Sequence, residues 1–267
     1  MNPFTPTFGV SPSVVLGRES VVTRFSRSLD GSVGDPRRIL LISGPRGIGK
    51  TITLNELEDA AAQHGWMVIR AHPYDLIGPL VNTIVPEAIQ KVSQQDNGGR
   101  RITGISVAGI GSISTEQRNT PQPVPSLISV LNQLCDVVGD RSGVLITLDE
   151  VQSADPNELW ELSSAIQDLR RDNRHIAFAA AGLPDGINSL LKHPGTTFLR
   201  RAQHVSLAPM TPQETIEILT STAGEVNITL NSDTLDKAAA LTRGYPFLIQ
   251  LLGFHLVEEV RSANLSL

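Results

Sequence analysis

The sequence predicts an α/β fold built on a parallel β-sheet and followed by a small all-helical part. Five short apolar segments of strand length are separated mostly by amphipathic helical patterns. A glycine-rich loop lies between the first of these segments and the helix after it, and from Pro209 onward only helical patterns occur. Strands that alternate with helices favour parallel pairing through helical crossovers, so we expect the sheet within residues 1–208 and the helical part over 209–267.

The composition is that of an ordinary globular protein and argues against several classes. The 267 residues carry a net charge of −5, which argues against a protein that coats nucleic acid through bulk charge, while a local basic patch stays open. A single cysteine, Cys135, excludes an internal disulfide framework. The sequence shows neither an apolar run of membrane-helix length nor the pattern of a secretion signal. We therefore expect a cytoplasmic protein without a membrane partner.

The periodicity of apolar residues places the regular elements. Short apolar runs predict strands over residues 39–43, 66–71, 144–148, 175–181 and 203–207. Apolar stripes at helical spacing predict helices over 18–29, from the glycine loop to residue 64, and over 76–95, 127–138, 156–171, 211–223, 232–242 and 246–262. Two short helical pieces are expected between the fourth strand and residue 201.

Three segments are expected to depart from regular structure. Residues 1–13 contain three prolines and no periodicity, which predicts an extended arm. Pro79 and Pro86 are expected to break or kink the helix over 76–95, because proline removes a hydrogen-bond donor and crowds the preceding turn. Alternating apolar and small residues with three glycines predict a hairpin over 101–114.

The glycine-rich loop carries the strongest functional signal. It fits the pattern G-x-x-x-x-G-K-[ST] in full, as Gly44, Pro45, Arg46, Gly47, Ile48, Gly49, Lys50 and Thr51. Glycines let backbone N–H groups turn toward a phosphate, and the N-terminus of the following helix adds its dipole. Lys50 is expected to reach the β- and γ-phosphates and the Thr51 hydroxyl to hold Mg²⁺. The strand before the loop and the helix after it favour this interpretation over an ordinary glycine-rich turn.

A pair of acids ends the third predicted strand. Asp149 and Glu150 follow the buried run over 144–148, and the carboxyl end of such a strand lies beside the phosphate loop in α/β sheets. Asp149 is expected to hold Mg²⁺, and Glu150 to orient or deprotonate the attacking water. The alternative is that the two acids only begin a solvated turn, which the phosphate loop upstream makes less favourable.

With these motifs the chain resembles the AAA+ superfamily, and more narrowly the STAND signalling ATPases and the origin-initiator-like ATPases. Residues 14–19 resemble the box that precedes the first helix and lies against the adenine, and 244–246 match a G-x-P motif whose proline packs by the base. Residues 180–184 follow the fourth strand as in STAND proteins. Residues 198–202 resemble the box that supplies an arginine finger. The resemblance implies nucleotide contacts from the whole glycine-rich loop and from Ile52, Val15, Gly17, Arg18 and Pro246, and catalytic roles for Lys50, Glu150, Arg200 and Arg201.

The same resemblance implies a P-loop fold, with a five-stranded parallel sheet in the order 5-1-4-3-2 and a C-terminal helical lid. It implies an ATP-binding protein, with ATP or ADP and Mg²⁺ as cofactors, that hydrolyses ATP and works as a nucleotide-regulated switch. Two alternatives stay open, a DNA-engaging initiator or loader and a nucleotide-binding scaffold with little turnover. Self-association or an effector protein is open as a partner, and the acidic charge does not favour nucleic acid.

The sequence departs from the family pattern in two places that concern the γ-phosphate. No polar residue is evident near the end of the fourth strand, over 176–181, and Phe247 lies near the expected position of the lid arginine. We therefore expect slow turnover, or turnover that depends on assembly, with an arginine supplied by a neighbouring chain. The chain ends at Leu267 without the module that usually follows the lid, which leaves open a shortened protein or a minimal member.

Overall fold

A six-stranded sheet, with every pairing parallel, organises the first part of the chain. The computed structural model describes residues 1–7, 12–96, 106–107, 125–140 and 142–265. The strands are β1 (Ile39–Ser43), β2 (Met67–Ala71), β3 (Ser106–Val107), β4 (Val144–Leu148), β5 (Ile176–Gly182) and β6 (Gln203–Ser206), in the spatial order β3-β2-β4-β5-β1-β6. The five expected strands therefore lie in the expected order, which confirms the predicted fold class.

The sixth strand, β3, differs from the expectation in its pairing. Ser106 and Val107 pair in parallel with Val68 and Ile69 at the edge of the sheet. These are the described residues of the segment for which a hairpin is predicted. They belong to an edge strand on β2, and the rest of the predicted hairpin lies outside the described residues.

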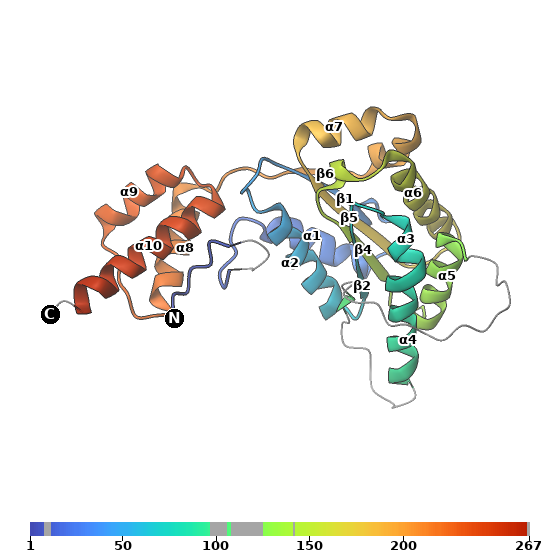
Figure 1. Cartoon of the computed structure of the whole chain (residues 1–267), viewed down its shortest axis with the longest axis horizontal. Coiled ribbons are helices and arrows are strands. Elements are labelled where there is room, and N and C mark those ends of the chain that lie inside the picture. The colour runs from blue at the N-terminus through green and yellow to red at the C-terminus, as the bar shows by residue number, and fades with distance from the viewer. Residues whose placement is uncertain (8–11, 97–105, 108–124, 141, 266–267) are drawn as a thin grey trace.

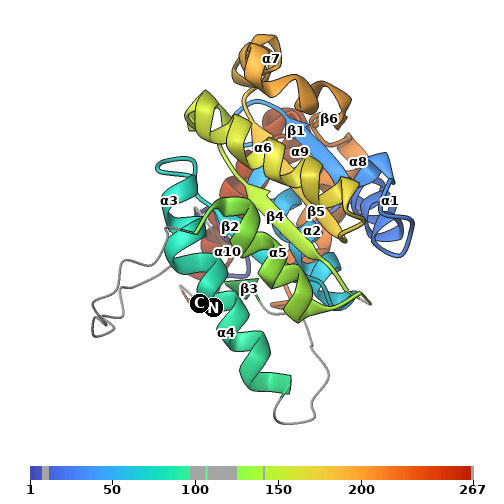
Figure 2. The same cartoon turned by 90° about the vertical axis from the view of Figure 1, so that its right-hand side faces the viewer.

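Helices cover both faces of the sheet (Figures 1 and 2). α1 (Glu19–Leu29) and α2 (Lys50–Gln63) lie on one face, and α4 (Val85–Asp96), α5 (Leu127–Val138) and α6 (Pro156–Arg171) on the other. Side chains alternate along β1, so Leu40 and Ile42 join the core under α1 and α2, whereas Ile39 and Leu41 join the core on the opposite face. Burial on both sides explains the continuous apolar run of this strand.

The two prolines of the third predicted helix are accommodated within one helical run. α3 (Ile77–Pro79) passes into the π-helical turn η2 (Leu80–Ile84) and then into α4. Pro86 lies in the first turn of α4 and cannot donate a hydrogen bond to the preceding turn. A π-helical turn absorbs such a mismatch by adding a residue to one turn, which is how the expected irregularity is realised.

Among the described residues, four further short helical elements lie between the strands and longer helices of the sheet-containing part. They are η1 (Pro36–Arg38) before β1, η3 (Val151–Ser153) after β4, and α7 (Pro184–Lys192) and η4 (Pro194–Arg201) between β5 and β6. The helical part consists of α8 (Pro212–Gly224), α9 (Ser232–Thr242) and α10 (Pro246–Leu265), at the left of Figure 1. Thr211 begins α8 with a capping box to Glu214, and the Asn231 side chain caps α9. Within the described residues, no helix is long and apolar enough to cross a membrane.

The N-terminal arm packs on the helical part. The Phe4 side chain is 2 % exposed and belongs to the apolar core of α8, α9 and α10. A Cβ atom at Gly253 would lie 2.3 Å from the Phe4 ring, so α10 needs glycine there to admit it. The Thr5 N–H donates to Gln250 Oε1 at 3.0 Å, and Arg261 donates to the Met1 carbonyl at 2.8 Å. These contacts therefore join the N-terminal arm to α10, near the other end of the chain.

A fully buried arginine joins α1 to the start of the sheet. The Arg38 guanidinium donates to the carbonyls of Ser28, Leu29 and Gly31 at 2.8, 2.8 and 2.7 Å, where α1 ends. Its charge also lies 5.0 Å from the centre of the Trp66 ring. Burial lowers the pKa of Arg38, and the three carbonyl acceptors offset the loss of hydration.

We predict that Arg38→Met lowers the free energy of unfolding by roughly 3–5 kcal/mol, because the apolar stem remains while three buried carbonyls lose their donor. Urea denaturation measures this change. Arg171→Met is the matched control, since Arg171 pairs with Asp168 at the surface and its loss should leave the urea midpoint almost unchanged. Equal midpoints for Arg38→Met and the wild type would contradict the assigned role.

Candidate nucleotide-binding site

The glycine-rich loop leaves the carboxyl end of β1 and begins α2. Gly49 caps the helix with φ of +94°, and Gly47 has φ of +76°, both in the region that favours glycine. Pro45, Arg46 and Gly47 are exposed at the tip of the loop, whereas Ile48 is buried beneath it. This conformation opens the loop and the positive end of the α2 dipole to one cavity, as a phosphate site requires.

Lys50 and Thr51, the first residues of α2, point their polar atoms in different directions. Lys50 Nζ donates to the Pro45 carbonyl at 3.2 Å, so the ammonium group curls back onto the loop. Thr51 Oγ1 donates to Asp149 Oδ2 at 2.5 Å, which joins the start of α2 to the end of β4. A hydroxyl and a carboxylate in contact offer oxygen ligands, which suit Mg²⁺. The predicted metal residues are thus brought together.

Glu150 stands beside them with an unusual backbone. Its φ is +49°, in a region that residues other than glycine seldom adopt and that is enriched at functional sites. The Glu150 N–H donates to Asp149 Oδ1 at 2.8 Å, and its exposed side chain lines the cavity of the glycine-rich loop. This cavity measures about 380 Å³ and includes Lys50 and Thr51. Lys50, Thr51 and Glu150 therefore line one space.

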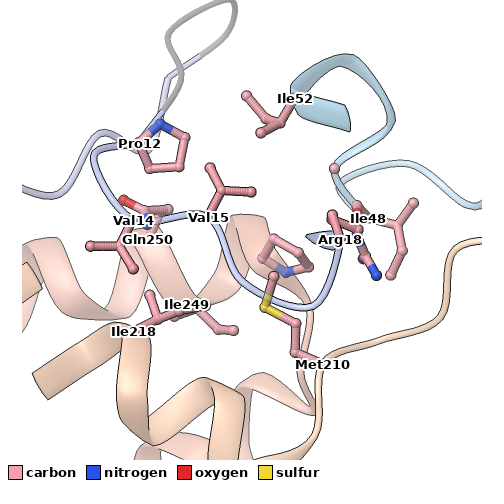
Figure 3. A pocket seen from close by; sticks show the side chains of 12 residues that line it. Pro12, Val14, Val15, Arg18, Ile48, Ile52, Met210, Ile218, Ile249 and Gln250 are labelled. Carbon is pink, nitrogen blue, oxygen red and sulfur yellow. Dashed lines mark hydrogen bonds between the residues drawn. The ribbon is translucent and has the colours of Figure 1, made fainter. Parts of the chain in front are cut away.

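An apolar pocket adjoins the loop (Figure 3). It contains Val15, Ile52 and Pro246, three of the residues for which nucleotide contact is predicted. The complete lining is Pro12, Val14, Val15, Arg18, Ile48, Gly49, Ile52, Met210, Ile218, Pro246, Ile249 and Gln250. Its apolar lining suits the flat ring of a nucleotide base, but the slot measures only about 40 Å³ and must widen to admit one.

Arg18 lines this pocket, whereas Gly17 does not. Arg18 donates to the carbonyls of Ile48 and Ala208, both at 3.0 Å, and so ties the glycine-rich loop to the linker before the lid. Its burial lowers the pKa of the guanidinium, with Glu214 and Glu19 acting in the opposite direction. Gly17 has φ of +72° and lies against the Glu214 carboxylate rather than on the pocket wall.

The helical part closes the cavity of the glycine-rich loop from the other side. The Phe247 N–H, in the first turn of α10, donates to the Gly47 carbonyl at 3.3 Å. Pro246 and Phe247 line the cavity together with Thr5, Thr7 and Pro12 of the N-terminal arm. Phe247, which the sequence places near the expected position of the lid arginine, therefore lines this cavity.

The two predicted arginines lie elsewhere. Arg200 Nε donates to the Leu191 carbonyl at 2.6 Å, at the end of α7. Arg201 lines a separate pocket with Ile39, at the beginning of β1 and therefore at the opposite end of that strand from the glycine-rich loop. Neither lines the cavity that contains Lys50. Both arginines lie in the last turn of η4, and Arg200 also bonds a carbonyl in the last turn of α7.

Some residues of the site gave no signal in the sequence. Thr5, Thr7 and Pro12 lie in a segment without periodicity, and only the fold brings them to the cavity. Gln152 contacts the Glu150 carboxylate from within η3, and its place two residues after the acid pair is the one feature that could have pointed to it.

Sequence comparison agrees with this geometry. Residues 14–178, more than half of the chain, match the family described as AAA ATPase domain. The chain belongs to this family. The matched region begins at the box before α1 and ends within β5, so it includes the glycine-rich loop and the acid pair. Membership makes the chain a nucleotide-binding ATPase domain of the AAA type.

Solved structures of archaeal proteins share the fold of this AAA ATPase domain. A Walker-type ATPase of Pyrococcus abyssi, PABY2304, matches with a TM-score of 0.59 and 18 % identity over 93 % of this chain and 69 % of its own. Cdc6p of Pyrobaculum aerophilum gives 0.58 and 16 %, over 97 % and 66 %. The ORC1 protein of Aeropyrum pernix, solved in complex with DNA, gives 0.55 and 19 %, over 95 % and 63 %.

The chain thus spans about two thirds of the length of these proteins. At such identities the likeness concerns the fold. No curated protein matches the sequence significantly.

Proposed function

We propose that this AAA ATPase domain binds Mg-ATP between the glycine-rich loop and α10, hydrolyses it slowly, and acts as a nucleotide-regulated switch of the STAND type. The hydrogen bond between Thr51 and Asp149 carries the proposal, because it brings the loop and the acid pair together across β5. The apolar pocket beside the loop takes the base.

Nucleotide binding requires Lys50 to change its hydrogen-bond partner. Lys50 leaves the Pro45 carbonyl and turns its ammonium group to the β- and γ-phosphates, where opposite charge replaces a neutral acceptor. Thr51 and Asp149 hold Mg²⁺, which neutralises charge on the phosphates when bound. Val15, Ile52 and Pro246 contact the base through apolar surface.

Hydrolysis requires a base at the γ-phosphate. Glu150 accepts a proton from water as the water oxygen bonds to the γ-phosphorus. The bond from that phosphorus to the β,γ-bridging oxygen breaks, and ADP leaves with the electron pair. The products are ADP and inorganic phosphate. Lys50 stabilises the charge that develops on the phosphate oxygens.

The switch follows from the contact between the loop and α10. The Phe247 N–H is bonded to the Gly47 carbonyl, within the loop that holds the phosphates. A change in the phosphates therefore changes the surroundings of the first turn of α10, and with it the position of the helical part. A nucleotide can bias two such positions only by binding them with different affinity.

We predict that Lys50→Ala weakens binding of Mg-ATP at least about tenfold, since it removes the cation from the phosphate site. Calorimetry with a non-hydrolysable ATP analogue measures the affinity, and thermal unfolding checks that the fold is kept. Lys192→Ala is the control, because this lysine lies in the last turn of α7, away from the cavity. Unchanged affinity in Lys50→Ala would refute the proposed site.

Glu150→Gln tests the enzyme against the scaffold alternative. The amide cannot accept the proton of water, so we expect about 10²–10⁴-fold lower turnover with analogue affinity within about twofold of wild type. Steady-state phosphate release and calorimetry provide the two measurements. Wild-type turnover no higher than that of the variant would leave a nucleotide-binding scaffold as the function.

The arginines before β6 test a contribution from a neighbouring chain. Arg200 and Arg201 lie away from their own cavity, so an arginine in trans, worth about 10³–10⁵ in rate, would make specific activity rise with protein concentration. Loss of this rise in Arg200→Ala or Arg201→Ala, measured separately, identifies the residue. Because Arg200 also caps α7, its variant needs a thermal unfolding control. Activity independent of concentration in the wild type would exclude the trans arginine.

A further inference from the structure

The end of β5 offers the site no polar side chain. All seven residues of this strand, Ile176–Gly182, are buried, and Ala180, Ala181 and Gly182 form its carboxyl end between the loop and the acid pair. What this position does supply is a backbone donor, the N–H of Leu183. A polar side chain that contacts the Glu150 carboxylate must therefore come from another element.

Gln152 of η3 fills this position. Its Nε2 donates to Glu150 Oε2, and its Oε1 accepts from the Leu183 N–H at 3.0 Å. The two partners also fix the orientation of the amide. The Leu183 N–H can only donate and so requires the oxygen, whereas an ionised Glu150 can only accept and so requires the NH₂ group.

Two glycines make room for this side chain. A Cβ atom at Gly182 would lie 2.5 Å from Gln152 Oε1, and one at Gly186 would lie 2.2 Å from Gln152 Cβ. Neither glycine has a positive φ, so the space they leave, and not their backbone conformation, is what the structure uses. The space at Gly182 admits the amide oxygen itself, whereas the space at Gly186 admits the Cβ and Cγ atoms of Gln152.

We propose that Gln152 is the positioning residue for Glu150. Its amide holds one carboxylate oxygen and leaves the other to accept the proton of the attacking water, which places the base without a polar residue on β5. This inference rests on the hydrolysis proposed above. The competing role is structural, since the Gln152 oxygen also satisfies the N–H of Leu183, the residue that caps α7.

The variants Gln152→Ala and Gln152→Glu separate the two roles. Gln152→Glu keeps the shape and the acceptor for the Leu183 N–H but replaces the donor to Glu150 by a negative charge. We expect turnover to fall about 10–100-fold in both variants, with the affinity for a non-hydrolysable ATP analogue within about twofold of wild type. Gln63→Ala, at the exposed end of α2, is the control and should keep wild-type turnover.

Separate values of kcat and KM give a readout that distinguishes the two roles. Gln152→Glu keeps the acceptor for the Leu183 N–H, so a purely structural role predicts a wild-type kcat for this variant. The positioning role instead predicts a lower kcat with an unchanged KM for ATP.

Gly182→Ala tests the positioning role without a substitution at Gln152. The added methyl group displaces the amide oxygen, so turnover should fall in the wild-type background and fall little further in the Gln152→Ala background. Additive losses in this double-mutant cycle would overturn the inference.

The remaining outcomes are distinct. If Gln152→Glu has the turnover and the KM of the wild type, Gln152 serves only the α7 cap and its positioning role is overturned. A wild-type chain without hydrolysis above Glu150→Gln would refute the proposed function itself, and this inference with it.

Discussion

The insertion of β5 between β1 and β4 is the constraint on which the site depends. Neighbouring strands lie about 4.8 Å apart, so the loop after β1 and the acids after β4 are separated by about twice that distance. Thr51 and Asp149 can meet only across the end of β5. Small residues at that end, Ala181 and Gly182, keep the crossing open, and the Gly182 carbonyl accepts from the Gly44 N–H at 3.3 Å.

The glycine-rich loop is also the point at which the helical part is held. Arg18 bonds the Ile48 carbonyl and the linker at Ala208, and the Phe247 N–H bonds the Gly47 carbonyl. These contacts use backbone carbonyls of the same loop whose N–H groups are suited to phosphates. In the switch proposed above, phosphate binding and the position of the helical part are linked through this one short segment.

The sequence predicted what local patterns determine. α5 and α6 begin and end where their apolar stripes and N-caps place them, and the glycine-rich loop and the acid pair meet because buried parallel strands align their carboxyl ends. It did not predict Arg38 or Gln152, since the roles of both depend on partners remote in the sequence, namely the end of α1 and the end of β5. The alternation over 101–114 predicts strand, and the described residues there, Ser106 and Val107, do form one, but this strand pairs with β2.

Gln152 connects the Glu150 carboxylate to α7. Its partner Leu183 begins α7, and the last turn of α7 is bonded through the Leu191 carbonyl to Arg200. A continuous set of contacts therefore leads from the Glu150 carboxylate to the segment before β6. A polar residue on β5 would be fixed in the sheet, whereas Gln152 follows both η3 and α7. If Gln152 positions Glu150 as proposed, a displacement of Leu183 at the start of α7 would change the orientation of the Glu150 carboxylate.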